Sequence, residues 1–96
     1  MTTRDATVVN PLGLHARPAA ALVKLASTFQ SHIEVARDDV SVNGKSIMGV
    51  MMLAAECGSV LTFKADGPDE EKAVEALCAR ALTALRVEMR SASLFV

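Results

Sequence analysis

The spacing of apolar residues divides this chain into short extended segments and two longer helical ones, and this division constrains the fold more than any other feature. Apolar residues recur every third or fourth position between residues 19 and 29 and again between residues 74 and 85, a spacing that builds one apolar face on a helix. Four segments instead have the alternating or β-branched character of strands: residues 6–9, 33–36, 40–42 and 60–65. With a short helix after residue 46, the predicted order is βαββαβα.

Turn signals separate these segments. Asp38-Asp39 and Asn43-Gly44 are typical of turns between strands and before a helix. The run Gly-Pro-Asp-Glu-Glu at residues 67–71 predicts the start of the last helix, with Pro68 at the first helical position and the acids at the positive end of the helix dipole. The acids of this run are better explained as helix-start charges than as metal ligands, so we predict no metal site.

The predicted order favours an α+β sandwich of two layers, in which helices cover one face of an antiparallel sheet. The length of 96 residues suits one small domain, residues 1–96, and no repeat or linker indicates a second. Residues 91–96 have two interpretations that the sequence leaves open. They are either a frayed tail or a segment that covers the edge of the sheet.

Composition excludes several classes of protein. The net charge is −1, and the basic residues are spread along the chain, which argues against a nucleic-acid-binding protein. The longest apolar stretches, such as residues 47–55, are too short to span a bilayer, and no signal-peptide pattern is present, so we expect a cytoplasmic protein without membrane insertion. Cys57 and Cys78 lack the spacing of a zinc site, and we expect both to be reduced thiols.

The run Gly13-Leu14-His15-Ala16-Arg17-Pro18-Ala19 places a histidine at a predicted helix start. The first N–H groups of a helix have no partner within it, and together with the helix dipole they make a seat for an anion. Pro18 suits this first turn because it has no N–H and its φ is already helical. A lone histidine in such a position is more often a surface or capping residue, but the arginine and proline at this spacing favour a functional role.

The chemistry that this run can support is phosphoryl transfer. A helix N-terminus disfavours the charged imidazolium, so His15 would stay neutral and nucleophilic near neutral pH. Arg17 adds a permanent positive charge and a planar set of donors for phosphate oxygens. The chain has no Walker-type glycine loop and no carboxylate cluster for magnesium. We therefore predict that the site receives and donates a phosphoryl group without a nucleotide or other cofactor.

Two motifs carry a resemblance to a known family. Residues 10–19 (NPLGLHARPA) resemble the active-site signature of HPr, the histidine-containing phosphocarrier family of the phosphoenolpyruvate-dependent phosphotransferase system. Residues 43–51 (NGKSIMGVM) resemble the family's second signature, around its regulatory serine. The resemblance covers roughly residues 3 to 87, and residues 88–96 form a C-terminal extension past the usual end of the family.

The resemblance implies the HPr-like open-faced β-sandwich, with a four-stranded antiparallel sheet. It also implies that Nδ1 of His15 accepts a phosphoryl group from the phosphohistidine of enzyme I and passes it to IIA domains during sugar transport. The backbone N–H groups near Ala16 and Arg17 and the Arg17 guanidinium would stabilise the transferred group, since the transition state is loose and needs mainly position and charge. Such a protein is a carrier and not a stand-alone enzyme.

Ser46 precedes an apolar helical run, so capping of the helix alone would explain this serine. The resemblance adds a second role, as a regulatory phosphorylation site. In the family, a dedicated HPr kinase/phosphorylase modifies this serine and weakens the phosphotransfer contact. A phosphate there would lie at the positive end of the helix.

The helix after Ser46 is apolar on almost all sides, although a short helix on a small domain can bury only one face. We expect Val50 and Leu53 to be in the core. Ile47, Met48 and Met51 should form an exposed apolar patch of the kind that marks a partner site. The resemblance implies that this patch, together with the start of the first helix, contacts enzyme I and IIA domains. The interface residues expected in this way are Ala16, Ala20, Ile47, Met48 and Met51.

An alternative function is a nitrogen-type or purely regulatory HPr-like protein that controls its partners by docking. The presence of both His15 and Arg17 argues against a loss of phosphotransfer, but it does not separate the two branches. Two other candidates are weaker. His32 is expected to be exposed to solvent, and Cys57 has no evident base that would make it catalytic. We expect a monomer.

Overall fold

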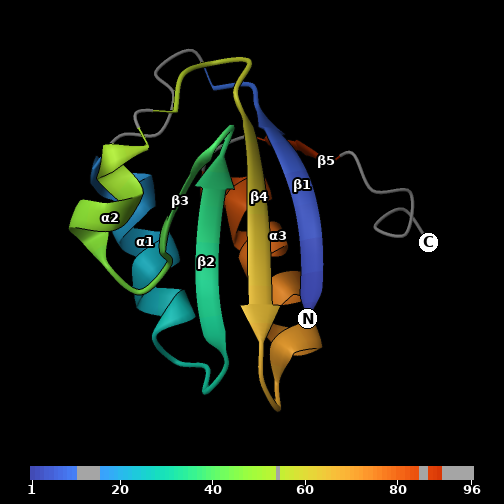
Figure 1. Ribbon diagram of the computed structural model, residues 1–96. Helices are drawn as coiled ribbons and strands as arrows, with labels where there is room; N and C mark the ends of the chain where they lie inside the picture. Colours follow the sequence, from blue (N-terminus) through green and yellow to red (C-terminus); the bar gives the residue numbers. More distant parts are fainter. Residues whose placement is uncertain (11–15, 54, 85–86, 90–96) are drawn as a thin grey trace.

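The structure, a computed structural model, describes residues 1–10, 16–53, 55–84 and 87–89 (Figure 1). Its elements follow the predicted order βαββαβα and end with one additional short strand. In chain order they are β1 (Thr2–Val8), α1 (Ala16–Ala26), β2 (His32–Arg37), β3 (Val40–Asn43), α2 (Ile47–Met52), β4 (Val60–Asp66), α3 (Glu70–Ala84) and β5 (Val87–Met89).

The strands form one antiparallel sheet in the order β3-β2-β4-β1-β5. The helices α1 and α3 pack against each other behind the sheet, and α2 lies beside α1 and β3 (Figure 1). The predicted α+β, open-faced architecture is therefore confirmed. β5 adds an edge strand beside β1, with Thr7 opposite Glu88, in a segment for which the sequence pattern predicted no element. Residues 91–96, for which two interpretations were open, lie outside the described residues.

The two faces of the sheet have opposite character because side chains alternate along each strand. Ala6 of β1 pairs with Leu61 of β4, and both are fully buried under the helices. Their neighbours Asp5 and Thr62, which are also paired, point to the open face, where the Thr62 hydroxyl donates to Asp5 Oδ1 at 2.7 Å. The strand β1 begins at Thr2, four residues earlier than predicted, because the polar residues at its start pair with β4 as far as Ala65.

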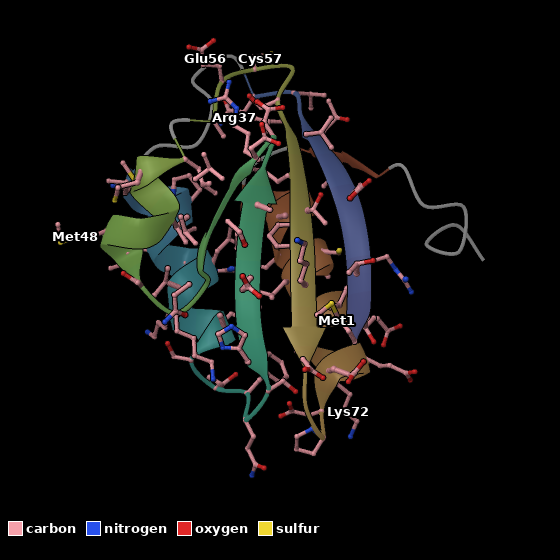
Figure 2. All side chains as sticks on the ribbon, in the orientation of Figure 1. Met1, Arg37, Met48, Glu56, Cys57 and Lys72 are labelled. Atoms are coloured by element: carbon pink, nitrogen blue, oxygen red, sulfur yellow. The ribbon has the colours of Figure 1, made fainter. Side chains whose placement is uncertain are left out.

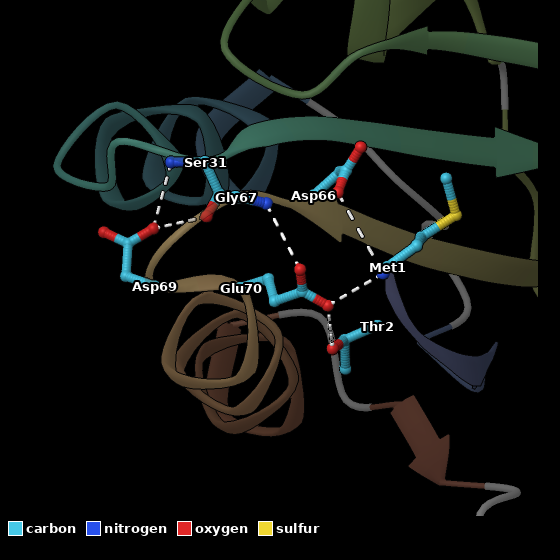
Figure 3. Close-up of polar contacts among 7 residues, drawn as sticks. All are labelled: Met1, Thr2, Ser31, Asp66, Gly67, Asp69 and Glu70. Atoms are coloured by element: carbon cyan, nitrogen blue, oxygen red, sulfur yellow. Dashed lines mark hydrogen bonds and ion pairs between the residues drawn. The ribbon is translucent and has the colours of Figure 1, made fainter.

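A corner between β4 and α3 joins distant parts of the chain through Asp69 (Figure 3). The Asp69 carboxylate accepts hydrogen bonds from the backbone N–H groups of Gln30 and Ser31, each at 2.9 Å, and from the Ser31 hydroxyl. These hydrogen bonds, led by that of the hydroxyl, lower the pKa of Asp69. The approach is close enough that a Cβ on Gly67 would lie 2.7 Å from Ser31 Cα, so only glycine fits there.

This corner also sets where α3 begins. The helix starts at Glu70, so the prediction of Pro68 as the first helical residue was wrong by two positions. The carbonyl of Asp69 accepts the first helical hydrogen bond, from Ala73 N–H at 2.9 Å. Asp69 is therefore the last residue before the helix, and its side chain binds the Gln30–Ser31 backbone instead of the start of its own helix.

Glu70 ties the start of β1 to α3. Its carboxylate accepts from the Thr2 hydroxyl at 2.6 Å and from Gly67 N–H at 3.2 Å, and it pairs with the Met1 amino group at 3.0 Å (Figure 3). These contacts, the Thr2 hydrogen bond first among them, lower the pKa of Glu70 to about 2. The carboxylate thus remains charged under all but strongly acidic conditions.

Candidate functional site

The first turn of α1 presents positive charge to solvent. The helix begins at Ala16, directly after the motif histidine, as predicted. Pro18 is buried, whereas Ala16 and Arg17 are exposed and Ala20 is half-buried. No acidic residue lies in this turn, so no carboxylate on it competes for Arg17 or for the free N–H groups. His15 lies outside the described residues, and its role stays a prediction.

Ser46 is the N-cap of α2, which confirms the structural part of its predicted role. Its backbone is extended, with φ −117° and ψ 119°, and its hydroxyl accepts from Gly49 N–H at 3.1 Å. Val50 N–H donates to the Ser46 carbonyl at 3.0 Å and begins the helix. The side chain is half-buried, so part of it remains accessible at the helix start.

Hydrogen bonds hold the turn before Ser46 to the α1–β2 loop and to strand β2. Lys45 Nζ donates to the Phe29 carbonyl at 2.7 Å, in the loop that follows α1, and Lys45 N–H donates to Asn43 Oδ1 at 2.9 Å. Gly44 N–H donates to the Ile33 carbonyl at 2.8 Å, and a Cβ on Gly44 would lie only 2.6 Å from Ile33 Cγ2. The start of α2 is thereby held against both the α1–β2 loop and the sheet.

The two faces of α2 differ as the sequence predicts. Val50 and Leu53 are buried, with 1% and 4% of their surface exposed. The opposite face carries an exposed apolar surface, which we call the α2 patch, with exposed fractions of 47% for Ile47, 78% for Met48, 37% for Met51 and 75% for Met52. Met52 was missed in the sequence analysis, although its position four residues after Met48 places it on the same side of the helix.

The α2 patch and the first turn of α1 lie close to each other. The two helices pack together and run in roughly opposite directions, so that the C-terminal end of α2 is beside the N-terminal end of α1 (Figure 1). Met48 points away from the body of the molecule (Figure 2). Because α2 is only about 9 Å long, a partner that covers it would reach from Ser46 to the neighbourhood of Arg17.

The remaining candidates lie elsewhere. His32 begins β2 at the other end of the molecule and is exposed as predicted, with its Nε2 3.6 Å from Glu34 Oε2. Neither cysteine forms a disulfide: Cys57 is exposed, and burial raises the pKa of Cys78 to about 11. Among the described residues, no three His, Cys, Asp or Glu side chains are grouped to hold a metal ion. No helix in this part of the chain is long and apolar enough to cross a membrane.

Comparisons with known proteins point to one family. A family model described as the PTS HPr component phosphorylation site matches residues 2–81. The phosphocarrier protein HPr of Cupriavidus necator is 53% identical over 79 residues, which cover 82% of this chain and 89% of that protein. The structure resembles the histidine-containing phosphocarrier protein of Mycoplasma with a TM-score of 0.85 and 37% identity, covering 94% of this chain and all of that one. It also resembles Crh, the catabolite repression HPr of Bacillus subtilis, with a TM-score of 0.61 and 40% identity, over 82% of this chain and 94% of that one.

Proposed function

The chain belongs to the HPr family of phosphocarrier proteins of the phosphotransferase system, and on that premise we propose that His15 is the residue that carries the phosphoryl group. In this proposal, the protein is cytoplasmic, enzyme I phosphorylates His15, and IIA domains of sugar transporters receive the group. The observation that carries the proposal is the first turn of α1. It follows the motif histidine directly, exposes Arg17, contains no acid and adjoins the α2 patch.

The proposed transfer is an in-line displacement at phosphorus. A ring nitrogen of neutral His15, Nδ1 by resemblance to the family, forms a bond to phosphorus while the bond to the donor imidazole of enzyme I breaks. In the second transfer, a histidine of the IIA domain forms a bond to phosphorus while the bond between phosphorus and His15 breaks. The protein supplies position and charge through the N–H groups at Ala16 and Arg17 and through the Arg17 guanidinium.

The exposure of Arg17 suits a carrier. A guanidinium in contact with water interacts with a phosphoryl group through a strongly screened field, so the contact adds only modest affinity. A buried cage of cations would hold the group more tightly and would slow its release to the next partner. We infer that Arg17 stabilises the group during transfer without trapping it on His15.

Docking is assigned to the surface around this turn. The α2 patch, together with Ala16 and Ala20 of the adjoining helix α1, would form the apolar area that contacts enzyme I and IIA domains in turn. Methionine side chains suit successive partners, because they repack at small energetic cost. Arg17 and the α2 patch would thus be used in both transfer steps.

Ser46 is proposed as a regulatory phosphorylation site for an HPr kinase/phosphorylase. Its half-buried hydroxyl lies at the start of the docking helix, where a phosphate would meet the positive end of the helix dipole. The added dianion would also stand beside an apolar docking area and would oppose the approach of partners. Phosphorylation is therefore expected to weaken docking without unfolding the protein.

A second candidate function is regulation of partners by docking, in a nitrogen-type or purely regulatory branch. The similarity to Crh, the catabolite repression HPr of Bacillus subtilis, favours keeping this candidate. Transfer from the phosphorylated protein to sugar-type and nitrogen-type IIA domains, measured side by side, would distinguish the two branches. A purely regulatory protein would pass the group to neither.

The carrier proposal is tested by incubating the protein with phosphoenolpyruvate and enzyme I and recording its intact mass before and after brief acid treatment. We expect a gain of one phosphoryl group that acid removes, because phosphohistidine is acid-labile. The His15→Ala variant should keep the melting curve of the parent and show no gain. A gain that survives in this variant would overturn the assignment to His15, and no gain in the parent would favour the docking function.

A further inference from the structure

The methionines of this protein are distributed unevenly between core and surface. Four have described side chains, and all four are exposed, with exposed fractions of 73% for Met1, 78% for Met48, 37% for Met51 and 75% for Met52. The described core contains no methionine and consists of Ala, Val, Leu, Ile, Phe and one Cys. Thioether sulfur, which is more easily oxidised than any of the aliphatic or aromatic groups in that core, is thus gathered mainly on one short helix.

The helix α2 does not depend on these methionines for its place in the fold. Val50 and Leu53 attach it to the core, Ser46 caps its start, and Lys45 fastens the preceding turn to the Phe29 carbonyl. None of these contacts involves a thioether. A modification of the methionine side chains would therefore change the surface of α2 without removing what holds the helix in place.

We propose that Met48, Met51 and Met52 form a redox modification site, at which peroxide converts the docking surface from apolar to polar. A sulfur lone pair attacks one peroxide oxygen, so that an S–O bond forms as the O–O bond breaks, and the second oxygen leaves as water after proton transfer. Sulfur loses two electrons, and hydrogen peroxide gains them. Methionine sulfoxide reductases reverse the change, taking two electrons from thiols, which become a disulfide.

The exposed fractions predict an order of reaction within the site. Met48 and Met52 are four residues apart, share one side of α2 and expose about three quarters of their surface. Met51 exposes about half as much. We expect Met48 and Met52 to be oxidised first and at similar rates, and Met51 to be oxidised more slowly.

The effect on docking follows from the cost of burying a polar group. A sulfoxide oxygen that is covered by an apolar partner surface loses its hydrogen bonds to water, and one such loss costs enough to reduce affinity several-fold or more. This consequence rests on the proposed function, since it requires that partners cover the α2 patch. The oxidation itself depends only on the exposure of the sulfur atoms.

The test uses the full chain with Cys57→Ser, because the exposed Cys57 thiol would also react with peroxide. The protein is treated with graded hydrogen peroxide, catalase removes the excess, and peptide mass mapping locates each added oxygen. Circular dichroism gives the melting temperature, and the initial rate of phosphorylation by enzyme I is measured at a low concentration of the carrier. The control is Met48→Leu/Met51→Leu/Met52→Leu in the same background, which keeps the apolar patch without thioethers.

We expect oxygen on Met48 and Met52 before Met51, an unchanged fold, and a fall in the phosphorylation rate of at least about fivefold. Treatment with both methionine sulfoxide reductases should restore the rate, and the leucine control should be insensitive to peroxide. Oxygen on all three residues with an undiminished rate would overturn this proposal alone. An untreated protein that accepts no phosphoryl group from enzyme I would instead overturn the carrier function and, with it, the docking consequence.

Discussion

At the β4–α3 corner Asp69 and Glu70 are engaged by hydrogen bonds, whereas at the α1–α2 end Arg17 and the thioether groups face solvent. Asp69 and Glu70 bind backbone and side-chain groups that lie more than 30 residues away in the chain. Arg17 and the α2 patch are instead exposed. The contrast separates residues that hold the fold together from residues that are free to meet a partner.

Among the described residues of the exposed end, the largest expected effect is that of Arg17→Ala. In the proposed function, the guanidinium stabilises charge in a transition state that forms under a docked enzyme I, where water no longer screens it, so its loss should slow transfer by about 100-fold. The melting temperature should stay at the parent value, because Arg17 is exposed. Rapid-quench kinetics measure the rate, and Arg17→Lys is the matched control, expected to retain part of it. A large fall in the melting temperature would mean that Arg17 is one of the residues that hold the fold together.

The opposite result is expected at the corner for Asp69→Ala. This change removes the acceptor for two backbone N–H groups and for the Ser31 hydroxyl, so thermal unfolding should begin several degrees lower. The phosphotransfer rate should not change below that temperature. Asp39→Ala, at an exposed position in the β2–β3 turn, is the control and should melt like the parent. If Asp69→Ala slowed transfer in the folded protein, the separation of the two ends would fail.

Acid should weaken the corner selectively. The contacts of Glu70 lower its pKa from 4.5 to about 2, so below 4.5 the unfolded chain binds more protons at this residue than the folded protein. The stabilisation is present above the unfolded pKa and is lost as the pH falls from 4.5 towards 2. Urea unfolding across this range should therefore show a smaller dependence on pH in Glu70→Gln than in the parent. Equal slopes for the two proteins would contradict the assignment.

A smaller effect, on the stability of α2, is expected for Ser46→Ala, because Ser46 both caps this helix and lies at the proposed docking surface. The hydroxyl accepts from Gly49 N–H, and the loss of such a cap costs about 1 kcal/mol. Hydrogen exchange should show faster opening of α2 than in the parent. Ser41→Ala, which removes an exposed hydroxyl bonded to Glu34, serves as the control. Ser46→Asp retains an acceptor at the cap and should restore the stability of the helix while it slows docking.

Local pattern was sufficient for much of the fold and for one part of the site. The helix α1 was predicted from apolar spacing over residues 19–29, although it ends at Ala26, and the cap at Ser46 follows from a serine before an apolar run. The same spacing separated Val50 and Leu53 from the exposed face of α2, and the exposures confirm it. These features depend on residues within one or two helical turns of each other.

Features that depend on distant partners could not be predicted in this way. β1 starts at Thr2 because β4 offers a pairing edge, and β5 forms because β1 has a second edge. Neither Thr2 nor Val87 carries a local signal for a strand boundary. The hydrogen bond from Ser31 N–H to Asp69 also carries no local signal, since the two residues are 38 positions apart.

The sequence by itself determined the order of the elements from β1 to α3, the family and the residues proposed for phosphotransfer, because short-range spacing and two compact motifs carry that information. Only the tertiary structure decided where the ends of strands lie, which carboxylates are engaged, and that the α2 patch adjoins the first turn of α1. The physical reason is that a hydrogen bond or a packed surface needs both of its partners. Those partners come together only when the chain has folded.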